Sequence, residues 1–353
     1  DSYGVKRTDV ELTVTSSNVV VNIPVEVIYL PIVYVSVDGS DSNGGGSRET
    51  AVASLAQAYE IVAENGKIII LNGTYRCGDL LLIEKNLDIV GEDNVTLISE
   101  ASSTALRINA VNVNMTNIKF YTTNQLMYAF LVQNNANLTI DECEFRNTDT
   151  NFALLFASMS NVNITNSKFV NNTAGGRMIY NQGYVVLDNV EICDNKVDMQ
   201  VITNGNKGLE LKNTIIRNNT CTAIISSSNN NVLLLNCTII DNPTKNYNLI
   251  QLSNTQNCTI KESTLINSKG TGAIFSLTNS ELNVSDSVIL NNDNDIFKFG
   301  TSDTSVVTAN DNWWGNNTKP VLGTVDADRW VSMSTTPDMA WAGDEVTVVA
   351  RFD

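Results

Sequence analysis

The sequence predicts an all-β fold, a parallel β-helix in which short strands wind around one shared core. An apolar pattern recurs with a period near 24 residues. Within each repeat the apolar residues alternate, as a strand with one buried face requires. An Asn or Asp also recurs at one turn position of seven consecutive repeats. A repeat this short cannot bury its apolar face alone, so neighbouring repeats must stack into a solenoid.

The repeats fix the expected length of the rod. Their eight-residue windows begin at Val113, Leu138, Val162, Val185, Leu209, Leu233, Cys258, Leu282 and Val306. With about three strands per coil, residues 67–318 predict about 10 coils. At about 4.8 Å between stacked strands, the rod would be roughly 50 Å long.

The recurring turn residue predicts a ladder of stacked side chains. It lies two positions after the last apolar residue of each window, at Asn147, Asn171, Asp194, Asn218, Asn242, Asn267 and Asn291. Asparagine tolerates the left-handed backbone conformation and forms local hydrogen bonds. We therefore expect these residues to form a buried row along the rod.

Both ends of a β-helix need a cap, because an open coil exposes its core and unpaired backbone. Residues 50–66 predict a helix that begins after the N-cap Ser54 and ends at Gly66. Its apolar face would consist of Leu55, Ala58, Ile61 and Val62. At the other end, Trp313 and Trp314 are expected to close the last coil.

Composition excludes several classes of function. The net charge is −16, which argues against nucleic acid and anionic lipid as partners. The chain has no histidine, so it contains no Ser-His-Asp or Cys-His nucleophile and no His-ligated zinc. No apolar run reaches the roughly 18 residues of a membrane span. No cofactor is expected.

Two sets of motifs resemble known proteins. YVSVDGSDSNGGG at 34–46 and KIIILNGTY at 67–75 resemble the opening of right-handed parallel β-helix proteins of the pectin-lyase-like superfamily. The Asn-rich coils and NWWGNN at 312–317 resemble adhesin-like surface proteins of methanogenic archaea. The resemblance implies a right-handed coil and a location at the cell surface, outside the cell.

The resemblance divides the chain into 1–32, the β-helix at 33–320, and 321–353. Segments 10–30 and 330–352 resemble the first strand pair of an immunoglobulin-like module, and each is too short to complete one. Either the chain is a segment of a longer protein, or its terminal strands complete a sheet in a neighbouring subunit. A third alternative is that each flank packs on its own β-helix as a cap.

Pectin-lyase-like β-helices are often enzymes, so the resemblance also implies that the chain could be a carbohydrate-active enzyme. Its hydrolases use clustered Asp with a nearby His, and its lyases use a calcium-binding acidic cluster with a basic residue. Here the acidic residues lie at scattered offsets, as at Asp141, Glu142 and Glu144. We therefore expect a non-catalytic structural or adhesive module. Its partners would be further copies, neighbouring modules or cell-surface glycans; the alternatives are a monomeric polysaccharide-binding adhesin and a calcium-dependent polysaccharide lyase.

The outward positions carry two further sets of candidates. A predicted apolar ridge, suited to an interface, consists of Ile215, Ile239, Val288, Ile266 and Leu290. The Asn-x-Ser/Thr motifs expected to face solvent, and so to accept glycans, are Asn114, Asn137, Asn163, Asn236, Asn257 and Asn283. The motifs at Asn171 and Asn218 are excluded because both belong to the expected buried ladder.

Two further sets of residues bear on metal binding and on disulfide formation. Asp38 and Asp41 could hold calcium through oxygen ligands, although a Gly-rich surface turn is the favoured interpretation, and no metal site is predicted. The six cysteines share no offset on adjacent coils, which favours free thiols.

Overall fold

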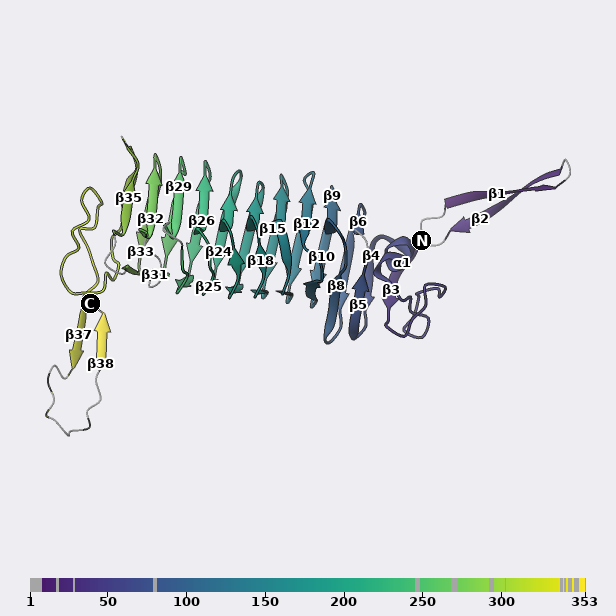
Figure 1. Cartoon of the computed structure of the whole chain (residues 1–353), viewed down its shortest axis with the longest axis horizontal. Coiled ribbons are helices and arrows are strands. Elements are labelled where there is room, and N and C mark those ends of the chain that lie inside the picture. Colours follow the sequence, from purple (N-terminus) through teal and green to yellow (C-terminus); the bar gives the residue numbers. More distant parts are fainter. Residues whose placement is uncertain are drawn as a thin grey trace.

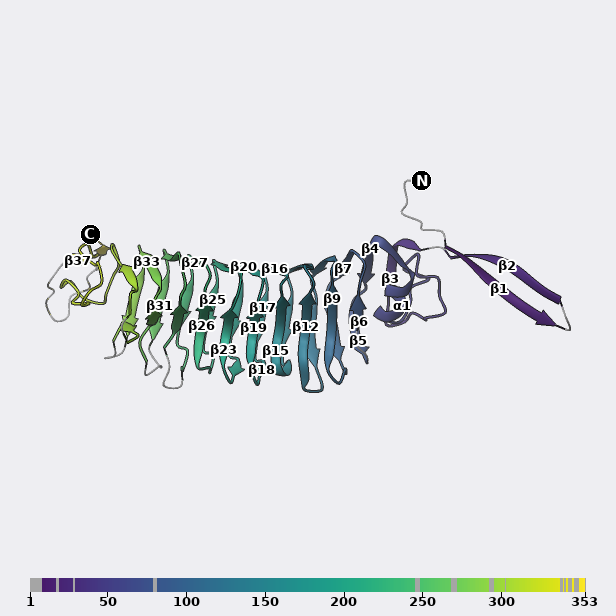
Figure 2. The same ribbon diagram turned by 90° about the horizontal axis from the view of Figure 1, so that it is seen from above.

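The structure is a computed structural model of the whole chain. It describes residues 8–16, 19–27, 29–78, 81–244, 248–267, 272–291, 295–301, 303–336, 339, 341, 345 and 349–352. Three parallel sheets wrap about one core and form about 10 coils, as the repeat predicts (Figures 1 and 2).

The coils contribute strands to all three sheets, and each strand pairs with the equivalent strand of the next coil. Two short strands, β18 and β22, are additional members of sheet III. Sheet I contains β3 (Leu30–Val35), β4 (Val62–Ile70), β7 (Leu87–Gly91), β10 (Asn112–Thr116), β13 (Asn137–Asp141), β16 (Asn161–Thr165), β20 (Tyr184–Asp188), β24 (Gly208–Lys212), β27 (Val232–Leu235), β30 (Cys258–Lys261), β33 (Glu281–Ser285) and β36 (Val306–Thr308). Sheet II contains β5 (Gly73–Cys77), β8 (Val95–Ser99), β11 (Lys119–Thr122), β14 (Glu144–Arg146), β17 (Lys168–Val170), β21 (Glu191–Cys193), β25 (Ile215–Arg217), β28 (Thr238–Ile240), β31 (Thr264–Asn267) and β34 (Val288–Asn291). Sheet III contains β6 (Leu81–Ile83), β9 (Thr104–Asn109), β12 (Leu126–Gln133), β15 (Asp149–Ser158), β18 (Thr173–Ala174), β19 (Arg177–Asn181), β22 (Lys196–Val197), β23 (Gln200–Asn204), β26 (Ala223–Ser228), β29 (Ile250–Ser253), β32 (Phe275–Thr278) and β35 (Phe297–Phe299).

The core consists of like side chains stacked on like. Ile140, Ile164 and Leu187 follow one another in sheet I and are fully buried. In sheet II the rings of Phe145 and Phe169 stack with centroids 4.7 Å apart and planes 6° from parallel. Because the period of each strand is two, these buried rows leave the alternate side chains of each sheet facing outward.

The predicted asparagine row forms two rows, which corrects its assignment as one buried ladder. Asn147, Asn171, Asp194 and Asn218 lie at the turn from sheet II to sheet III with positive φ, and all are exposed. The Asn171 amide donates to the Asn147 side-chain oxygen at 2.6 Å, so these residues do stack, but at the surface.

The buried ladder lies one residue beyond the exposed row, and it includes Asn242, whose predicted burial is confirmed. Its members are Asn172, Asn195, Asn219 and Asn242. The Asn195 amide donates to the Phe169 carbonyl at 2.9 Å and to the Asn219 side-chain oxygen at 2.8 Å. Its own oxygen accepts the backbone N–H of Asn172 at 2.8 Å. The left-handed residue turns the chain sharply, so the residue after it points inward and must satisfy the buried backbone of the corner.

One predicted window is wrong by a single residue. Leu209 pairs with Val232, so the repeat begins at Val232 and not at Leu233. Ile239 consequently faces the core with 0% exposure, and Ile240 faces outward. Because VLLL and II are apolar on both faces, alternation alone could not fix the register there.

The last two predicted ladder residues belong to strands. Asn267 and Asn291 end β31 and β34 and pair directly with each other. Asn267 is buried, and its amide donates to the Asn291 side-chain oxygen at 2.9 Å. These two asparagines therefore join the coils by the same kind of contact in extended backbone.

The N-terminal cap is a shorter helix than predicted. Helix α1 (Leu55–Ile61) begins at the N-cap Ser54, whose hydroxyl accepts from the Gln57 N–H at 3.1 Å. It ends before Val62, which starts β4, and Gly66 lies within that strand. A Cβ at Gly66 would meet the Val62 side chain at 2.6 Å, so the glycine permits a close approach of backbone and does not end the helix.

At the C-terminal end the two tryptophans differ in role. Trp314 is 8% exposed and packs on the core, with its ring 6.3 Å from that of Phe297. Trp313 pairs through its backbone with Val288 of sheet II and is half-buried. Further bridges, Thr308 with Asp326 and Asn312 with Trp330, extend the contacts of the rod beyond residue 320.

The flanks form two antiparallel hairpins at opposite ends of the rod (Figure 1). They consist of β1 (Thr8–Ser16) with β2 (Val19–Val27), and of β37 (Met333–Thr336) with β38 (Val349–Phe352). Whether they belong to immunoglobulin-like modules stays a prediction. Among the described residues, no helix is long and apolar enough to cross a membrane.

The buried ladder makes the first prediction. Asn195→Ala should lower the free energy of unfolding by about 2–4 kcal/mol, because it leaves the Asn172 N–H and the Phe169 carbonyl buried without partners. The matched control Asn171→Gly, at an exposed residue with φ 55°, should change it by less than about 0.5 kcal/mol. Urea unfolding measures both, and equal losses would contradict the assignment of the ladder.

Candidate functional site

The six predicted glycan acceptors all lie on sheet I or at its edges, and all are exposed. Asn137 belongs to a surface row in which its amide donates to Asn112 at 2.6 Å and its oxygen accepts from Asn161 at 2.8 Å. The Asn114 amide donates to Asp88 at 2.8 Å. The other four are Asn163, Asn236, Asn257 and Asn283. Glycan attachment at these positions stays a prediction.

Two sequons were excluded as glycan acceptors because they were expected to be buried, and that reason is wrong. Asn171 and Asn218 are exposed at the corner between sheets II and III. The Asn218 amide donates to Asp194 at 2.5 Å, which is a surface contact. The geometry therefore gives no ground for treating either asparagine as inaccessible.

Sheet II changes from charged to apolar along the rod. Lys119, Glu144, Lys168 and Glu191 follow one another in register on its outer face. The same row continues with Ile215, which is 42% exposed, and ends with the half-buried Val288. Ile240, Ile266 and Leu290 form a second outward row beside it. Ile239 is not part of this ridge, because it is buried in the core.

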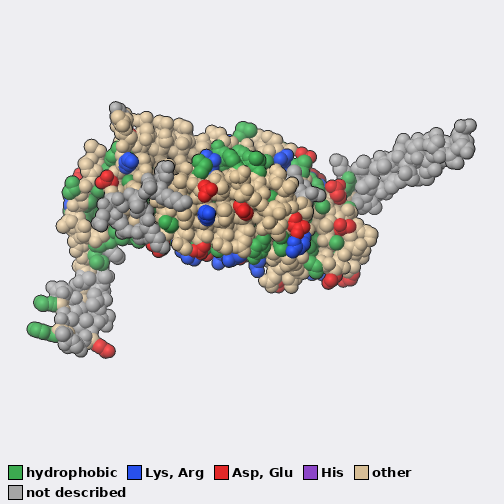
Figure 3. Space-filling model, viewed as in Figure 1, with side chains coloured by type: hydrophobic (Ala, Val, Ile, Leu, Met, Phe, Trp, Pro, Cys, Tyr) green, Lys and Arg blue, Asp and Glu red, His purple; other side chains and the backbone are tan. Residues whose placement is uncertain are grey.

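Sheet III carries a cluster of outward aromatic rings that the sequence predictions missed. The cluster, here called the aromatic platform, consists of Tyr128 on β12, Phe152 and Phe156 on β15, and Tyr180 on β19, all half-buried. Phe156 and Tyr180 stack with centroids 4.8 Å apart at 11°, and Tyr128 stacks on Phe156 at 5.6 Å. In Figure 3 hydrophobic side chains gather over the part of this face that carries β12 and its neighbours.

Arg177 lies against the platform. Its guanidinium is 4.6 Å from the centroid of the Tyr180 ring and 5.7 Å from that of Phe152. Its Nε donates to the Thr203 hydroxyl at 3.1 Å. These contacts fix the position of the guanidinium by cation–π attraction and one hydrogen bond.

Two glycines before Arg177 allow the backbone to approach β15 closely. Gly175 and Gly176 precede β19, and a Cβ on Gly176 would collide with the carbonyl of Phe152. Only a glycine, which has no Cβ, lets the backbone lie this close to β15. That close approach brings Arg177 next to Phe152.

Polar groups surround the rings. Gln182 donates from its amide to the Tyr180 hydroxyl at 2.8 Å. The Thr203 hydroxyl, which receives the Arg177 contact, donates to the Gln200 oxygen at 3.2 Å. An apolar ring surface bordered by amides, hydroxyls and a guanidinium offers both stacking and hydrogen bonds to one ligand.

The spacing of the rings was a usable signal. Tyr128 and Phe152 are 24 residues apart, as are Phe156 and Tyr180. This is the period of the repeat, and Phe156 and Tyr180 do pair in register, whereas Tyr128 pairs with Ala153, one residue beyond Phe152.

Contacts with neighbouring groups shift the pKa of several titratable side chains on the coils. On sheet I the Tyr184 hydroxyl donates to Glu210, which raises the pKa of Tyr184 to about 12. Lys212 lies 2.6 Å from Glu210, and that contact raises the pKa of the lysine. Lys85, whose pKa is lowered by burial, donates instead to the carbonyls of Tyr59 and Val62 at the end of α1.

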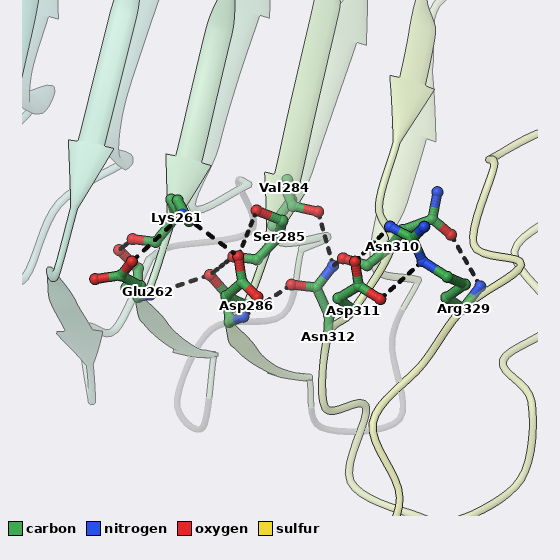
Figure 4. Close-up of polar contacts among 11 residues, drawn as sticks. Lys261, Glu262, Val284, Ser285, Asp286, Asn310, Asp311, Asn312 and Arg329 are labelled. Atoms are coloured by element: carbon green, nitrogen blue, oxygen red, sulfur yellow. Dashed lines mark hydrogen bonds and ion pairs between the residues drawn. The ribbon is translucent and has the colours of Figure 1, made fainter. Parts of the chain in front are cut away.

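The carboxylates at the C-terminal coils are paired in the same way (Figure 4). Lys261 lies 3.5 Å from Glu262 and 3.8 Å from Asp286. Arg329 binds both oxygens of Asp311, at 2.9 and 2.6 Å. These contacts fasten the C-terminal cap to the preceding coils.

Possible metal ligands do not cluster in the described part of the chain, where no group of three Cys, Asp or Glu could hold an ion. The Asp41 carboxylate accepts the backbone N–H groups of Ala53 and Ser54, both at 2.9 Å, so it braces the loop before α1. All six cysteines are free thiols, and burial raises the pKa of Cys258 to about 12.

The fold and the repeat define a β-helix protein, and comparison with known families agrees. A family model described as "Right handed beta helix region" matches residues 104–245 and 152–318. The chain belongs to this family, which also establishes the right-handed coil predicted by resemblance.

Several solved structures share the fold. Pectate lyase Pel9A aligns with a TM-score of 0.51 at 13% identity, over 78% of each chain. XylC in complex with xylose aligns at 0.48 and 6% identity, over 76% of this chain and 70% of that one. The A-module of the Azotobacter vinelandii mannuronan C-5 epimerase AlgE4 aligns at 0.44 and 11% identity, over 70% and 86%. At these identities only the fold is shared, and no curated protein matches the sequence.

The corrected register gives a prediction at two adjacent isoleucines. Ile239→Lys should prevent folding or lower the free energy of unfolding by at least about 4 kcal/mol, because it buries an unpaired charge in the core. The control Ile240→Lys, whose side chain faces outward, should cost about 1 kcal/mol or less. Thermal unfolding measures both, and the reverse order would restore the register that begins at Leu233.

Proposed function

We propose that the chain is a non-catalytic, saccharide-binding rod that serves as an adhesive module outside the cell. The observation that carries the proposal is the aromatic platform on sheet III. Its rings form a half-exposed surface on adjacent coils, which is an unusual place for apolar side chains without a partner. An exposed apolar surface of this kind with polar groups at its border is typical of a binding site.

A saccharide is the ligand that this chemistry fits. One face of a sugar ring presents C–H groups, which are attracted to the electron-rich face of an aromatic ring. Its hydroxyl groups then lie at the border, where the Tyr180 hydroxyl, the Gln200 amide and the Thr203 hydroxyl can exchange hydrogen bonds. A chain of sugars along the rod would meet successive rings, because the rings recur from coil to coil.

The non-catalytic part of the proposal rests on two lysines. Abstraction of a proton by lysine needs a pKa lowered towards neutrality. The Glu210 contact raises the pKa of Lys212. Burial lowers the pKa of Lys85, but its ammonium donates to the carbonyls of Tyr59 and Val62 at the cap, which hold it there. A lyase is therefore the weaker alternative.

Placement outside the cell, as in the adhesin-like surface proteins of methanogenic archaea, is proposed on the sequence resemblance. Joining of subunits through terminal strands is a second part of the proposal. The β1–β2 and β37–β38 hairpins each consist of two strands that pair with no third strand among the described residues. An isolated hairpin is only marginally stable in water, so a third strand from another module or copy would stabilise each one.

The rings can be tested by affinity electrophoresis in gels that contain a panel of soluble neutral and acidic polysaccharides. Wild-type protein should be retarded by at least one of them. Phe156→Ala and Tyr180→Ala should each weaken that binding roughly 3- to 10-fold, because each removes a stacking surface.

The matched control is Tyr121→Ala, which removes a half-buried outward ring from sheet II. It should leave the retardation unchanged. Absence of retardation by every polysaccharide, or an equal loss in the control, would contradict the proposal.

A further inference from the structure

The seven arginines between residues 48 and 329 fall into two groups. Arg48, Arg76, Arg146, Arg217 and Arg329 each form an ion pair with a carboxylate. Arg107 and Arg177 form none with any described residue, although the chain carries 38 acidic residues. Both of these lie on the outer face of sheet III.

These two arginines border the aromatic platform at its two ends. Arg107 on β9 pairs in register with Leu131, which pairs with Phe156. Arg177 on β19 pairs with Ala153 of β15. Three strand spacings separate β9 from β19, which is about 14 Å along the rod. Tyr128, Phe152 and Phe156 lie on the two strands between them, and Tyr180 lies on the same strand as Arg177.

Each guanidinium has donors without partners. The Nε of Arg107 is buried and makes no hydrogen bond within the described part of the chain. Arg177 uses its Nε on Thr203 and its face on two rings, which leaves both terminal nitrogens without a described partner. The Arg177 guanidinium, held flat against the rings, presents the edge with its two terminal nitrogens, which suits a carboxylate or sulfate bound through two parallel hydrogen bonds. At Arg107 the Nε is buried, so a ligand would bind the terminal nitrogens of the guanidinium.

We propose that the platform selects an acidic saccharide that lies along the rod, with one anionic group at Arg177 and another at Arg107. This rests on the proposed saccharide binding and adds the ligand's charge and direction. Because the net charge is −16, the rest of the surface repels an acidic ligand, and binding one requires local cations. The two arginines without ion pairs would supply these cations at the positions of the ligand's anionic groups.

The experiment compares acidic polysaccharides with neutral counterparts of the same backbone. The pairs are carboxymethylcellulose with hydroxyethylcellulose, polygalacturonate with its methyl ester, and alginate with its propylene glycol ester. Wild-type protein should bind at least one acidic member at least tenfold more tightly than its neutral counterpart. A protein that binds the neutral member equally well, or no acidic member, would overturn the proposal.

The variants locate the effect. Arg177→Gln and Arg107→Gln should each weaken binding of the acidic member roughly 10- to 100-fold, the value of a charge-assisted hydrogen bond, and weaken binding of the neutral member by a much smaller factor. Arg217→Gln, at an exposed arginine on sheet II, is the control and should change neither. Circular dichroism and the unfolding temperature establish that each variant is folded.

The outcomes separate this proposal from the one on which it rests. Equal binding of the acidic and neutral members, weakened by Phe156→Ala and Tyr180→Ala but not by Arg177→Gln, would keep the saccharide site and reject its acidic specificity. An effect of Arg177→Gln without one of Arg107→Gln would reject the two-ended, axial placement. Equal losses for acidic and neutral members would mean that the arginine only supports the rings.

Discussion

Every feature of this protein depends on the in-register pairing of each strand with its equivalent in the next coil. This pairing fixes the separation of the coils at a strand spacing, and it makes side chains at equivalent positions neighbours. A row of isoleucines then becomes a core, a row of asparagines becomes a ladder, and a row of aromatic residues becomes a surface. The sequence repeats because the same physical problem recurs about every 24 residues.

The corners are the costly part of such a coil, since each must reverse the chain without leaving buried backbone unpaired. The protein solves this with two adjacent residues of different roles. An exposed residue with positive φ, such as Asn218, turns the chain, and the next residue, Asn219, enters the core. The Asn219 amide then donates to the Ile192 carbonyl at 2.9 Å and to Asn242 at 3.0 Å. The asparagine content, 49 of 353 residues, reflects both roles.

The periodicity was enough to predict the coils, their number and the position of the turns. It could not decide which of two consecutive asparagines is buried, because Asn171 and Asn172 differ only in backbone conformation. It also failed where a strand is apolar on both faces, so that Ile239 and Ile240 exchanged roles. The binding surface was missed for another reason: Phe156 and Tyr180 match the apolar pattern, and only the fold shows that they face outward.

The three faces of the rod consequently differ in chemistry. Sheet I carries asparagines and sequons, sheet II carries ion pairs followed by an apolar ridge, and sheet III carries rings with unpaired arginines.

Hydroxyl-radical footprinting tests most directly the central claim that a saccharide binds the aromatic platform on sheet III, because aromatic side chains report their own exposure. With a bound acidic polysaccharide, oxidation of Phe152, Phe156 and Tyr180 should fall several-fold while that of Tyr121 on sheet II stays constant. Protection confined to sheet I or sheet II would contradict the assignment of the saccharide to sheet III.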